Sequence, residues 1–457
     1  MAGIGFELKK ILKEDRIFSV LKMYGYSGML SAGPWVISII AILLVGFINI
    51  ASSHSGSSSF SFPIIITYAI ALASSLIITG IIQLPFTRYT ADLIFANREN
   101  EVLPSYFATL LVSWIVGFIV SVPLAMWAFE GQSLLFIVGI VSTFLILCGV
   151  WTSNILAVSL TYYRGVLLAY FISYSLIVIG SYFFGNTLEV LMLIFLGGNS
   201  LLLIILMTLI VKTYESEYLL DFKFFTNGKF YWSLGFAGLF YTMGAWADKF
   251  IFWYHPLTGN SVIGVLHASI VYDMPIFIAY LSIIPGMAIF FYRLEADFAE
   301  QYDLFFNSVR DGSTLELIHR YKNSMIRTIR HALREIMVIQ GIINIILFLS
   351  APTLFQFLNI PQLYLSLFYI LTIGAQLQLG FMSVLAILYY LDRRMVALYL
   401  SVAFFFLNVI LTLVSIYLGP AFFGYGYAVS LLIVFIASLL VIRKEMKGLV
   451  YETFMLQ

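Results

Sequence analysis

The sequence predicts an all-α integral membrane protein of about twelve transmembrane helices, built from two parallel halves. Three observations predict this class. First, 61% of the 457 residues are apolar, 10% are charged and the mean hydropathy is +0.99, so the chain cannot form a water-soluble surface. Second, the basic residues fall on one side of the predicted helices, and third, the two halves repeat. The apolar runs lack the alternation of a membrane β-barrel, which leaves helices to satisfy the backbone in lipid.

The elements follow in order from the amino terminus. Residues 1–22 place apolar side chains near helical spacing opposite a charged face, which predicts an amphipathic interfacial helix. Twelve apolar runs long enough to span a bilayer follow, at 23–50, 62–86, 104–129, 133–159, 165–185, 188–211, 231–254, 275–292, 332–357, 363–391, 395–418 and 421–442. The predicted domains are a first lobe (23–211), a cytoplasmic linker (212–230), a second lobe (231–442) and a cytoplasmic tail (443–457).

The positions of the basic residues predict the orientation. With the amino terminus inside, 23 of the 24 Lys and Arg residues lie in inside segments, and Lys249 within the seventh span is the exception. Cytoplasmic loops accumulate Lys and Arg. We therefore expect a multi-pass protein with both termini in the cytoplasm.

The longest inside segment, about 293–331, offers the largest cytoplasmic docking surface. Residues 311–314, Asp-Gly-Ser-Thr, predict a break and a cap between two short helices. Alternatively, the segment only connects two spans and rests on lipid headgroups.

The internal repeat consists of three local matches in the same order and on the same side of the membrane. They pair 31–35 with 242–246, 88–93 with 293–298, and 156–170 with 385–399. Such repeats are typical of transporters.

The opening decapeptide MAGIGFELKK (1–10) and the Gly-Pro-Trp at 33–35 resemble the PelG family, the inner-membrane transporters of Pel exopolysaccharide secretion in bacteria. The resemblance covers the whole chain, and that family is similar to the polysaccharide and multidrug flippase superfamily. It implies two six-helix lobes around a central cleft lined by spans one, two, seven and eight, with alternating access in the bacterial cytoplasmic (inner) membrane.

The resemblance also implies the cargo and the partners. The expected function is inner-membrane translocation of a Pel-type exopolysaccharide, an amino-sugar polymer or its lipid-linked precursor. The implied partners are the glycosyltransferase PelF and the membrane proteins PelD and PelE, besides membrane lipids, and no nucleic acid is expected.

Four residues are candidates for the substrate path. Asp248 and Lys249 are ionisable residues inside a span, which usually have a function because they are costly in a bilayer. Adjacent residues point about 100° apart, so the two are not expected to face each other. Alternatively, both lie at the outer interface, where Lys249 could snorkel. The rings of Trp35 and Trp246 could stack on sugars, or they could serve as packing and interface anchors.

The repeated Arg-x-x-Ala-Asp ends of spans two and eight are candidates for a cytoplasmic gate. Arg88 could pair with Asp92 and Arg293 with Asp297, each four residues apart on one helix. Alternatively, Arg88 could pair with Asp297 and Arg293 with Asp92 across the cleft. Only the second pairing would close a gate.

Catalytic chemistry is not predicted. The sequence has no phosphate-binding glycine loop, metal-spaced His/Cys cluster or nucleophile triad, so we expect neither a cofactor nor an enzyme. The first outer loop, near 51–61, has no carboxylate of the kind that membrane glycosyltransferases need. The single cysteine, Cys148, is expected to pack in a span. The remaining function classes are a transporter of polymer or lipid-linked sugar, a cation-coupled drug exporter, and a membrane scaffold for a cytosolic glycosyltransferase.

Overall fold

The computed structural model describes most of the chain. The described residues are 27–28, 33–34, 36–46, 48, 61–159, 163–226, 230–357 and 360–455. The chain divides into two compact units: unit 1 is Met1–Gly33 with Val271–Gln457, and unit 2 is Pro34–Ile270. The amphipathic helix predicted at 1–22 lies outside the described residues, as do parts of the first span.

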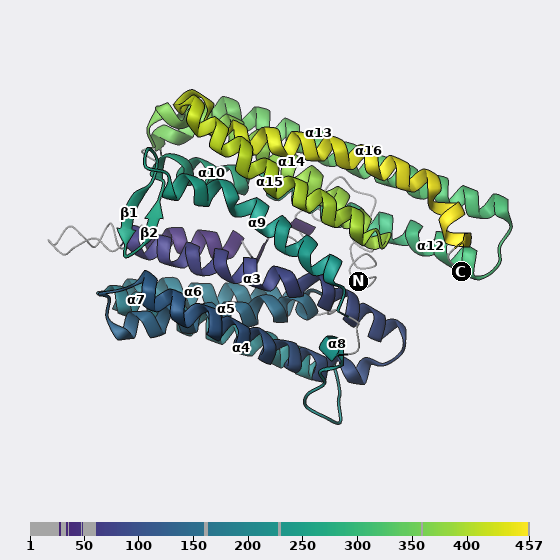
Figure 1. Cartoon of the computed structure of the whole chain (residues 1–457), viewed down its shortest axis with the longest axis horizontal. Helices are drawn as coiled ribbons and strands as arrows, with labels where there is room; N and C mark the ends of the chain where they lie inside the picture. The colour runs from purple at the N-terminus through teal and green to yellow at the C-terminus, as the bar shows by residue number, and fades with distance from the viewer. Residues whose placement is uncertain are drawn as a thin grey trace. The chain divides into compact units, whose positions relative to one another are not determined.

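Unit 2 consists of long apolar helices followed by a linker and a small hairpin (Figure 1). Its elements are α3 (Ser61–Phe95), α4 (Val102–Ala128), α5 (Leu134–Ser159), α6 (Tyr163–Phe184), α7 (Leu188–Thr213), α8 (Lys223–Thr226), α9 (Trp232–Tyr254), β1 (Asn260–Ile263) and β2 (Leu266–Ala268). The antiparallel hairpin, which the sequence analysis does not predict, has Val265 N donating to Ala128 O at 3.0 Å.

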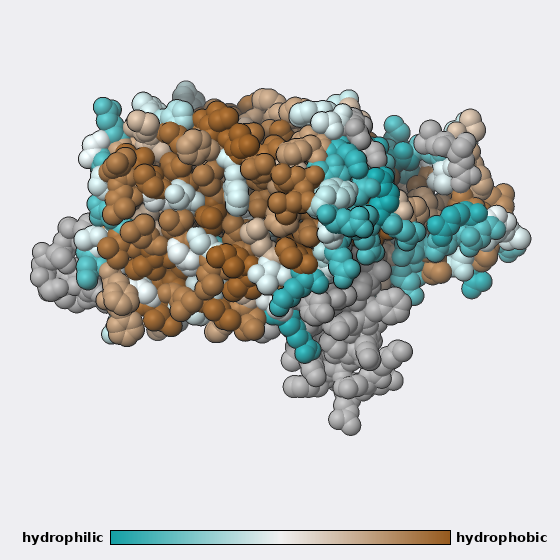
Figure 2. Space-filling view, turned by 90° about the horizontal axis from the view of Figure 1, so that it is seen from below, coloured by the Kyte–Doolittle hydropathy of each residue, from teal (hydrophilic) through white to brown (hydrophobic). Residues whose placement is uncertain are grey.

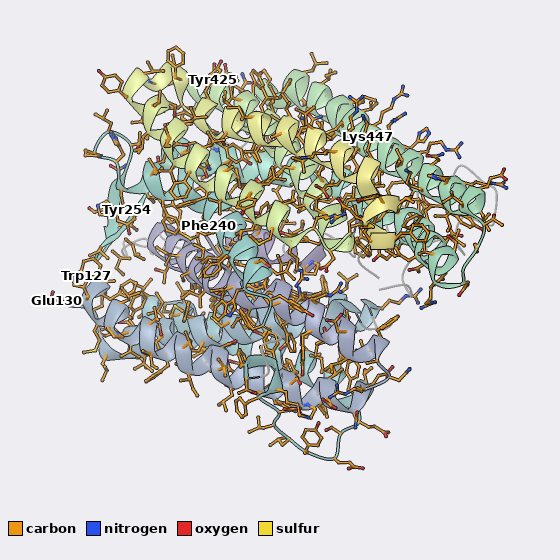
Figure 3. The ribbon with its side chains drawn as sticks, turned by 45° about the vertical axis from the view of Figure 1, so that its right-hand side comes forward. Trp127, Glu130, Phe240, Tyr254, Tyr425 and Lys447 are labelled. Carbon is orange, nitrogen blue, oxygen red and sulfur yellow. The ribbon has the colours of Figure 1, made fainter. Side chains whose placement is uncertain are left out.

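Unit 1 contains the remaining helices. They are α10 (Ile270–Ser282), α11 (Ile284–Tyr292), the π-helical turn η3 (Arg293–Phe298), α12 (Ala299–Arg310), α13 (Leu315–Phe357), α14 (Leu365–Tyr390), α15 (Arg394–Leu418) and α16 (Tyr425–Met455). α16 packs against α14 and α15. In Figure 3, Tyr425 lies at the start of α16 and Lys447 lies in its charged last part.

The surface matches a membrane environment. Ten helices of the described residues are long and apolar enough to cross a bilayer, and a shorter apolar helix covers Val36–Gly46. In unit 2 the exposed side chains along α4 to α7 form an apolar field, with hydrophilic residues gathered at one end (Figure 2). α9 is helical where the seventh span is predicted. It is not among the ten, because its small residues, Asp248 and Lys249 lower its mean hydropathy.

Two predicted elements differ from the structure. The span predicted at 275–292 is two helices that meet at Ile283, because Pro285 in the first turn of α11 lacks the N–H that a continuous helix would use. The break predicted at 311–314 is confirmed, with Gly312 at a φ of +64°. The second helix, however, is not short: α13 runs 43 residues from the segment predicted to be cytoplasmic through the next span without interruption.

α3 and α9 cross at glycines, so that their backbones touch. A Cβ on Gly238 would lie 2.3 Å from Gly80 O, and one on Gly235 would lie 2.8 Å from Ile81 O. Membrane helices pack closely where residues are small. This crossing fixes α9, and with it Asp248, on α3 within unit 2. The lobe boundaries predicted from the sequence stay a prediction, although they place α9 in the second lobe.

Candidate functional site

Asp248 and Lys249 form a buried ion pair on α9. Asp248 is 0% and Lys249 5% exposed, and Lys249 Nζ lies 3.1 Å from both carboxylate oxygens of Asp248. Nζ also donates to Ala245 O at 2.9 Å. The expectation that these neighbours cannot meet is wrong. The flexible lysine chain turns back along the helix, reaching the carbonyl four residues earlier and the carboxylate beside it.

The burial of Lys249 argues against the snorkelling alternative, because its ammonium group is held by protein atoms. Removing one partner of a buried pair leaves an uncompensated charge, which destabilises proteins by about 3–5 kcal/mol. Asp248 is therefore needed wherever Lys249 is charged. The pair also gives α9 a polar feature that cargo or a cation could compete for.

Three aromatic rings near the pair in sequence contact one another on α9. Trp246 and Phe250 contact Trp253, with ring centroids 6.4 and 5.2 Å apart respectively. Trp253 is buried and Trp246 is half-buried, so part of the Trp246 ring remains accessible. Trp35 lies outside the described residues. Packing thus accounts for Trp253, while a role in the substrate path stays a prediction for Trp246.

At one end of unit 2, Arg88 and Asp92 pair along α3. Arg88 Nε lies 3.1 Å from Asp92 Oδ1, and the side chains are 39% and 42% exposed. Tyr231, at the start of α9, donates its hydroxyl to Asp92 Oδ2 at 2.9 Å. The sequence analysis misses Tyr231, since nothing in a one-dimensional pattern links positions 139 residues apart. Asp92 therefore joins the ends of α3 and α9.

The linker between α7 and α9 is docked on the same end by charges. Lys223 Nζ lies 3.2 Å from Asp221 and 3.5 Å from Glu101, and Glu101 also pairs with Arg98 at 2.5 Å. The pKa of Lys223 is raised, chiefly because its ammonium group hydrogen-bonds to Asp221. Asp221 N donates to Pro104 O at 3.2 Å, which ties the linker to α4.

In unit 1, Arg293 and Asp297 also pair within one helical segment, and Arg293 Nε lies 2.5 Å from Glu335 on α13. These residues line an open hollow of about 600 Å³ together with His331 and other polar groups of η3, α12 and α13. The π-helical turn η3 carries the Arg-x-x-Ala-Asp sequence, and such turns occur often at functional sites. Both Arg–Asp pairs are thus local, and the cross-cleft pairing stays a prediction.

A network of amides fills the interior of unit 1. Gln340 Nε2 donates to Ser282 O at 3.0 Å and to Asn344 Oδ1 at 2.9 Å, and Asn344 Nδ2 donates to Gln376 Oε1 at 2.7 Å. These amides therefore join α10, α13 and α14 by hydrogen bonds between helices.

Two tyrosines belong to a second part of this interior. Tyr427 and Tyr280 donate to Gln378 Oε1 at 2.5 and 3.2 Å. The sequence analysis misses all three residues. Polar side chains in apolar spans are the signal that could have found them.

The described residues contain no group of three or more His, Cys, Asp or Glu that could hold a metal ion. Cys148 is buried. The groups of the candidate site can bind and reorganise charges, which suits translocation.

Solved structures share the fold. An outward-facing multidrug resistance MATE family transporter of the MOP superfamily superimposes with a TM-score of 0.65 at 15% identity, over 93% of this chain and 96% of that one. A MOP superfamily transporter from Pyrococcus furiosus gives 0.63 at 14%, over 93% and 96%. MATE in the bent conformation gives 0.61 at 13%, over 98% of each chain. No curated protein sequence matches the chain.

The predicted fold class is thereby confirmed as an all-α membrane transporter fold of the MATE type, which has two six-helix lobes. The cleft between the lobes stays a prediction. A family model of exopolysaccharide exporters (EPS-E) matches residues 1–454. Because the match spans nearly the whole chain, this protein belongs to the PelG family of exopolysaccharide exporters, a family of transporters and not of enzymes.

Proposed function

We propose that the chain translocates a Pel-type exopolysaccharide, either the amino-sugar polymer or its lipid-linked precursor, across the bacterial inner membrane. The observation that carries the proposal is the match to an exopolysaccharide exporter family over residues 1–454, on a fold of the MATE transporter type. Both termini are proposed to be cytoplasmic. The proposed partners are the glycosyltransferase PelF and the membrane proteins PelD and PelE, which would supply the polymer.

Within this function we assign the Asp248–Lys249 pair to the substrate path. Two ionisable side chains buried within one apolar span are costly in a bilayer, and such residues mark substrate or ion pathways. Opening the pair would expose an ammonium group and a carboxylate, which can bind hydroxyl or amino groups of a sugar. Trp35 and Trp246 are proposed to stack on the sugar faces.

The test replaces the charges singly and together. Asp248→Asn should lower secreted polysaccharide at least tenfold in a strain without another copy. The double variant Asp248→Asn/Lys249→Met removes both charges and so leaves no uncompensated one. If the pair acts in translocation, the double variant stays inactive at normal protein abundance. Recovery of export in the double variant would show that the pair is only structural.

The cargo itself is tested with purified protein in vesicles. Movement of amino-sugar oligomers from the cytoplasmic side of the protein to its outer side supports the proposal if Asp248→Asn abolishes this movement. Cation-driven transport of drug cations without sugar movement would assign the chain to drug export instead. Absence of any transport together with retained recruitment of the glycosyltransferase would assign it to a scaffold.

The cytoplasmic gate is proposed from the repeated Arg–Asp pairs. Local pairs of this exposure contribute only about 0.3–0.5 kcal/mol, whereas switching between states takes couplings of about 1–3 kcal/mol. Arg88→Asp should impair export. Rescue by adding Asp297→Arg supports pairing across the cleft, while rescue by Asp92→Arg alone would leave only the local pair.

A further inference from the structure

The cytoplasmic part of α13 carries a stripe of arginines on one face. Arg320, Arg327 and Arg334 are seven residues apart, and Arg330 lies one turn from Arg327. Seven residues are close to two helical turns, so the four side chains lie on one side of the helix. All four are exposed. We call these four residues the arginine stripe.

The opposite face of the same segment is packed. Ile318, Met325, Ile329 and Leu333 are buried, and α12 packs against α13. The helical segment is therefore folded and oriented, and the arginine stripe is presented in a fixed direction. In Figure 3, nitrogen-tipped side chains project from α13 near the label of Lys447.

The arginine stripe differs from other arginines in its lack of internal partners. Arg98, Arg293, Arg393 and others each pair with a carboxylate. Among the residues that the structure describes, none lies within ion-pair distance of the four stripe arginines, although Glu316 is one turn from Arg320. Four aligned and unpaired charges are therefore available to an anionic partner.

The distance that α13 extends beyond the membrane decides whether lipid headgroups or a protein can bind the arginine stripe. The uninterrupted apolar part of α13 begins after Glu335. At 1.5 Å per residue, Arg327 lies about 13 Å and Arg320 about 24 Å along the axis from that boundary. The interfacial layer is only about 5–8 Å thick. A tilt of about 40° still leaves Arg320 roughly 18 Å away. Anionic headgroups can reach Arg334 and Arg330, but not Arg320.

From this geometry we infer that the arginine stripe is a docking surface for an acidic helix of a partner protein. Carboxylates seven residues apart on a helix repeat every ~10.5 Å, which matches the spacing from Arg320 to Arg327 to Arg334. Such surfaces speed association and set orientation through charge complementarity. The inference does not depend on which substrate the protein moves.

The test measures binding of two helical probe peptides to the full chain in nanodiscs of zwitterionic phosphatidylcholine. Both probes are 21-residue alanine–glutamine peptides with six glutamates. One probe carries them on a single face and the other spreads them around the helix. Fluorescence anisotropy should show at least tenfold tighter binding of the single-face probe. Arg320→Glu with Arg327→Glu should weaken that binding at least tenfold.

A matched control separates the arginine stripe from general attraction. Lys444→Glu with Lys447→Glu makes the same change in charge at exposed positions of α16 and should alter binding less than twofold. The inference would be overturned if the two double variants lost the same amount of binding affinity for the single-face probe. It would also be overturned if the two probes bound equally well. Unchanged thermal unfolding midpoints would show that the variants are folded.

The membrane surface and a second copy of the chain are two other partners that could bind the arginine stripe, and each would give a distinct result. A fluorophore at Asn323→Cys, within the exposed segment, should not be quenched by a headgroup-attached quencher in nanodiscs with 30% phosphatidylglycerol. Quenching there would assign the arginine stripe to the membrane. A dimer of the purified protein that Arg320→Glu/Arg327→Glu dissociates would assign it to a second copy, which would likewise overturn the inference.

Discussion

The crossing of α3 and α9 gives a sharp test of the packing in unit 2. In Gly238→Ala the new methyl group would lie 2.3 Å from Gly80 O and 3.3 Å from Gly80 C. Both neighbours are backbone atoms that no side-chain rotation can move. The helices must therefore separate by about 1 Å to reach ordinary contact, and a gap of ~0.5–1 Å already loses a quarter to a half of the dispersion energy of the atoms affected.

The expected change in the free energy of unfolding for Gly238→Ala is the balance of two opposing effects, overpacking and helix propensity. Overpacking of this kind destabilises by about 1–3 kcal/mol. Alanine favours the helix over glycine by about 0.5–1 kcal/mol. Gly238→Ala should therefore be destabilising by roughly 0.5–2 kcal/mol, measured from the thermal unfolding midpoint of the purified protein in detergent.

A second glycine provides the control. A Cβ on Gly197, an exposed residue in the middle of α7, would meet no atom within 4 Å. Gly197→Ala should therefore be neutral or stabilising by up to about 1 kcal/mol. If both variants unfold at the same temperature, the close crossing of α3 and α9 is refuted.

Three further outcomes are expected. Gln340→Leu should destabilise the purified protein by about 1–3 kcal/mol, because it leaves hydrogen-bonding groups of neighbouring helices unsatisfied; an unchanged unfolding midpoint would contradict the network. On a cysteine-free background, an impermeant thiol reagent should label Asn186→Cys but not Asn323→Cys in intact cells, and the reverse pattern would invert the topology. Because the pKa of Lys223 is raised above its ordinary value of 10.5, its stabilisation of the linker is fully present below that pH and is lost as the pH rises through the folded pKa. Proteolysis of the linker should therefore increase at more alkaline pH, and Lys223→Met should remove that dependence.

The sequence predicts most spans correctly because the membrane imposes a simple rule on composition and length. Apolar runs of sufficient length must be helices in lipid. The rule fails at element ends that lipid does not determine. The hydropathy of residues 315–331 does not show whether they continue into the following span. The one sequence feature that agrees with the unbroken α13 is that these residues include no Gly or Pro.

The candidate site is predicted less completely, because it depends on side-chain flexibility and on contacts distant in sequence. Asp248 and Lys249 are found by their charge in an apolar span, but their pairing depends on the rotamer of a four-carbon chain. The contact of Tyr231 with Asp92 depends on how α9 begins beside the end of α3. Neither leaves a periodic pattern.

The continuity of α13 has a mechanical consequence. A single 43-residue helix joins the arginine stripe to Gln340 in the interior of unit 1, and no Gly-Pro hinge lies between Arg320 and Gln340. The segment therefore acts as a lever: a rotation of about 5° about Gln340 would move the Cα of Arg320 by roughly 2–3 Å, given ~30 Å between them. A force on the end of α13 that carries the arginine stripe would therefore rotate the helix about Gln340 instead of bending it.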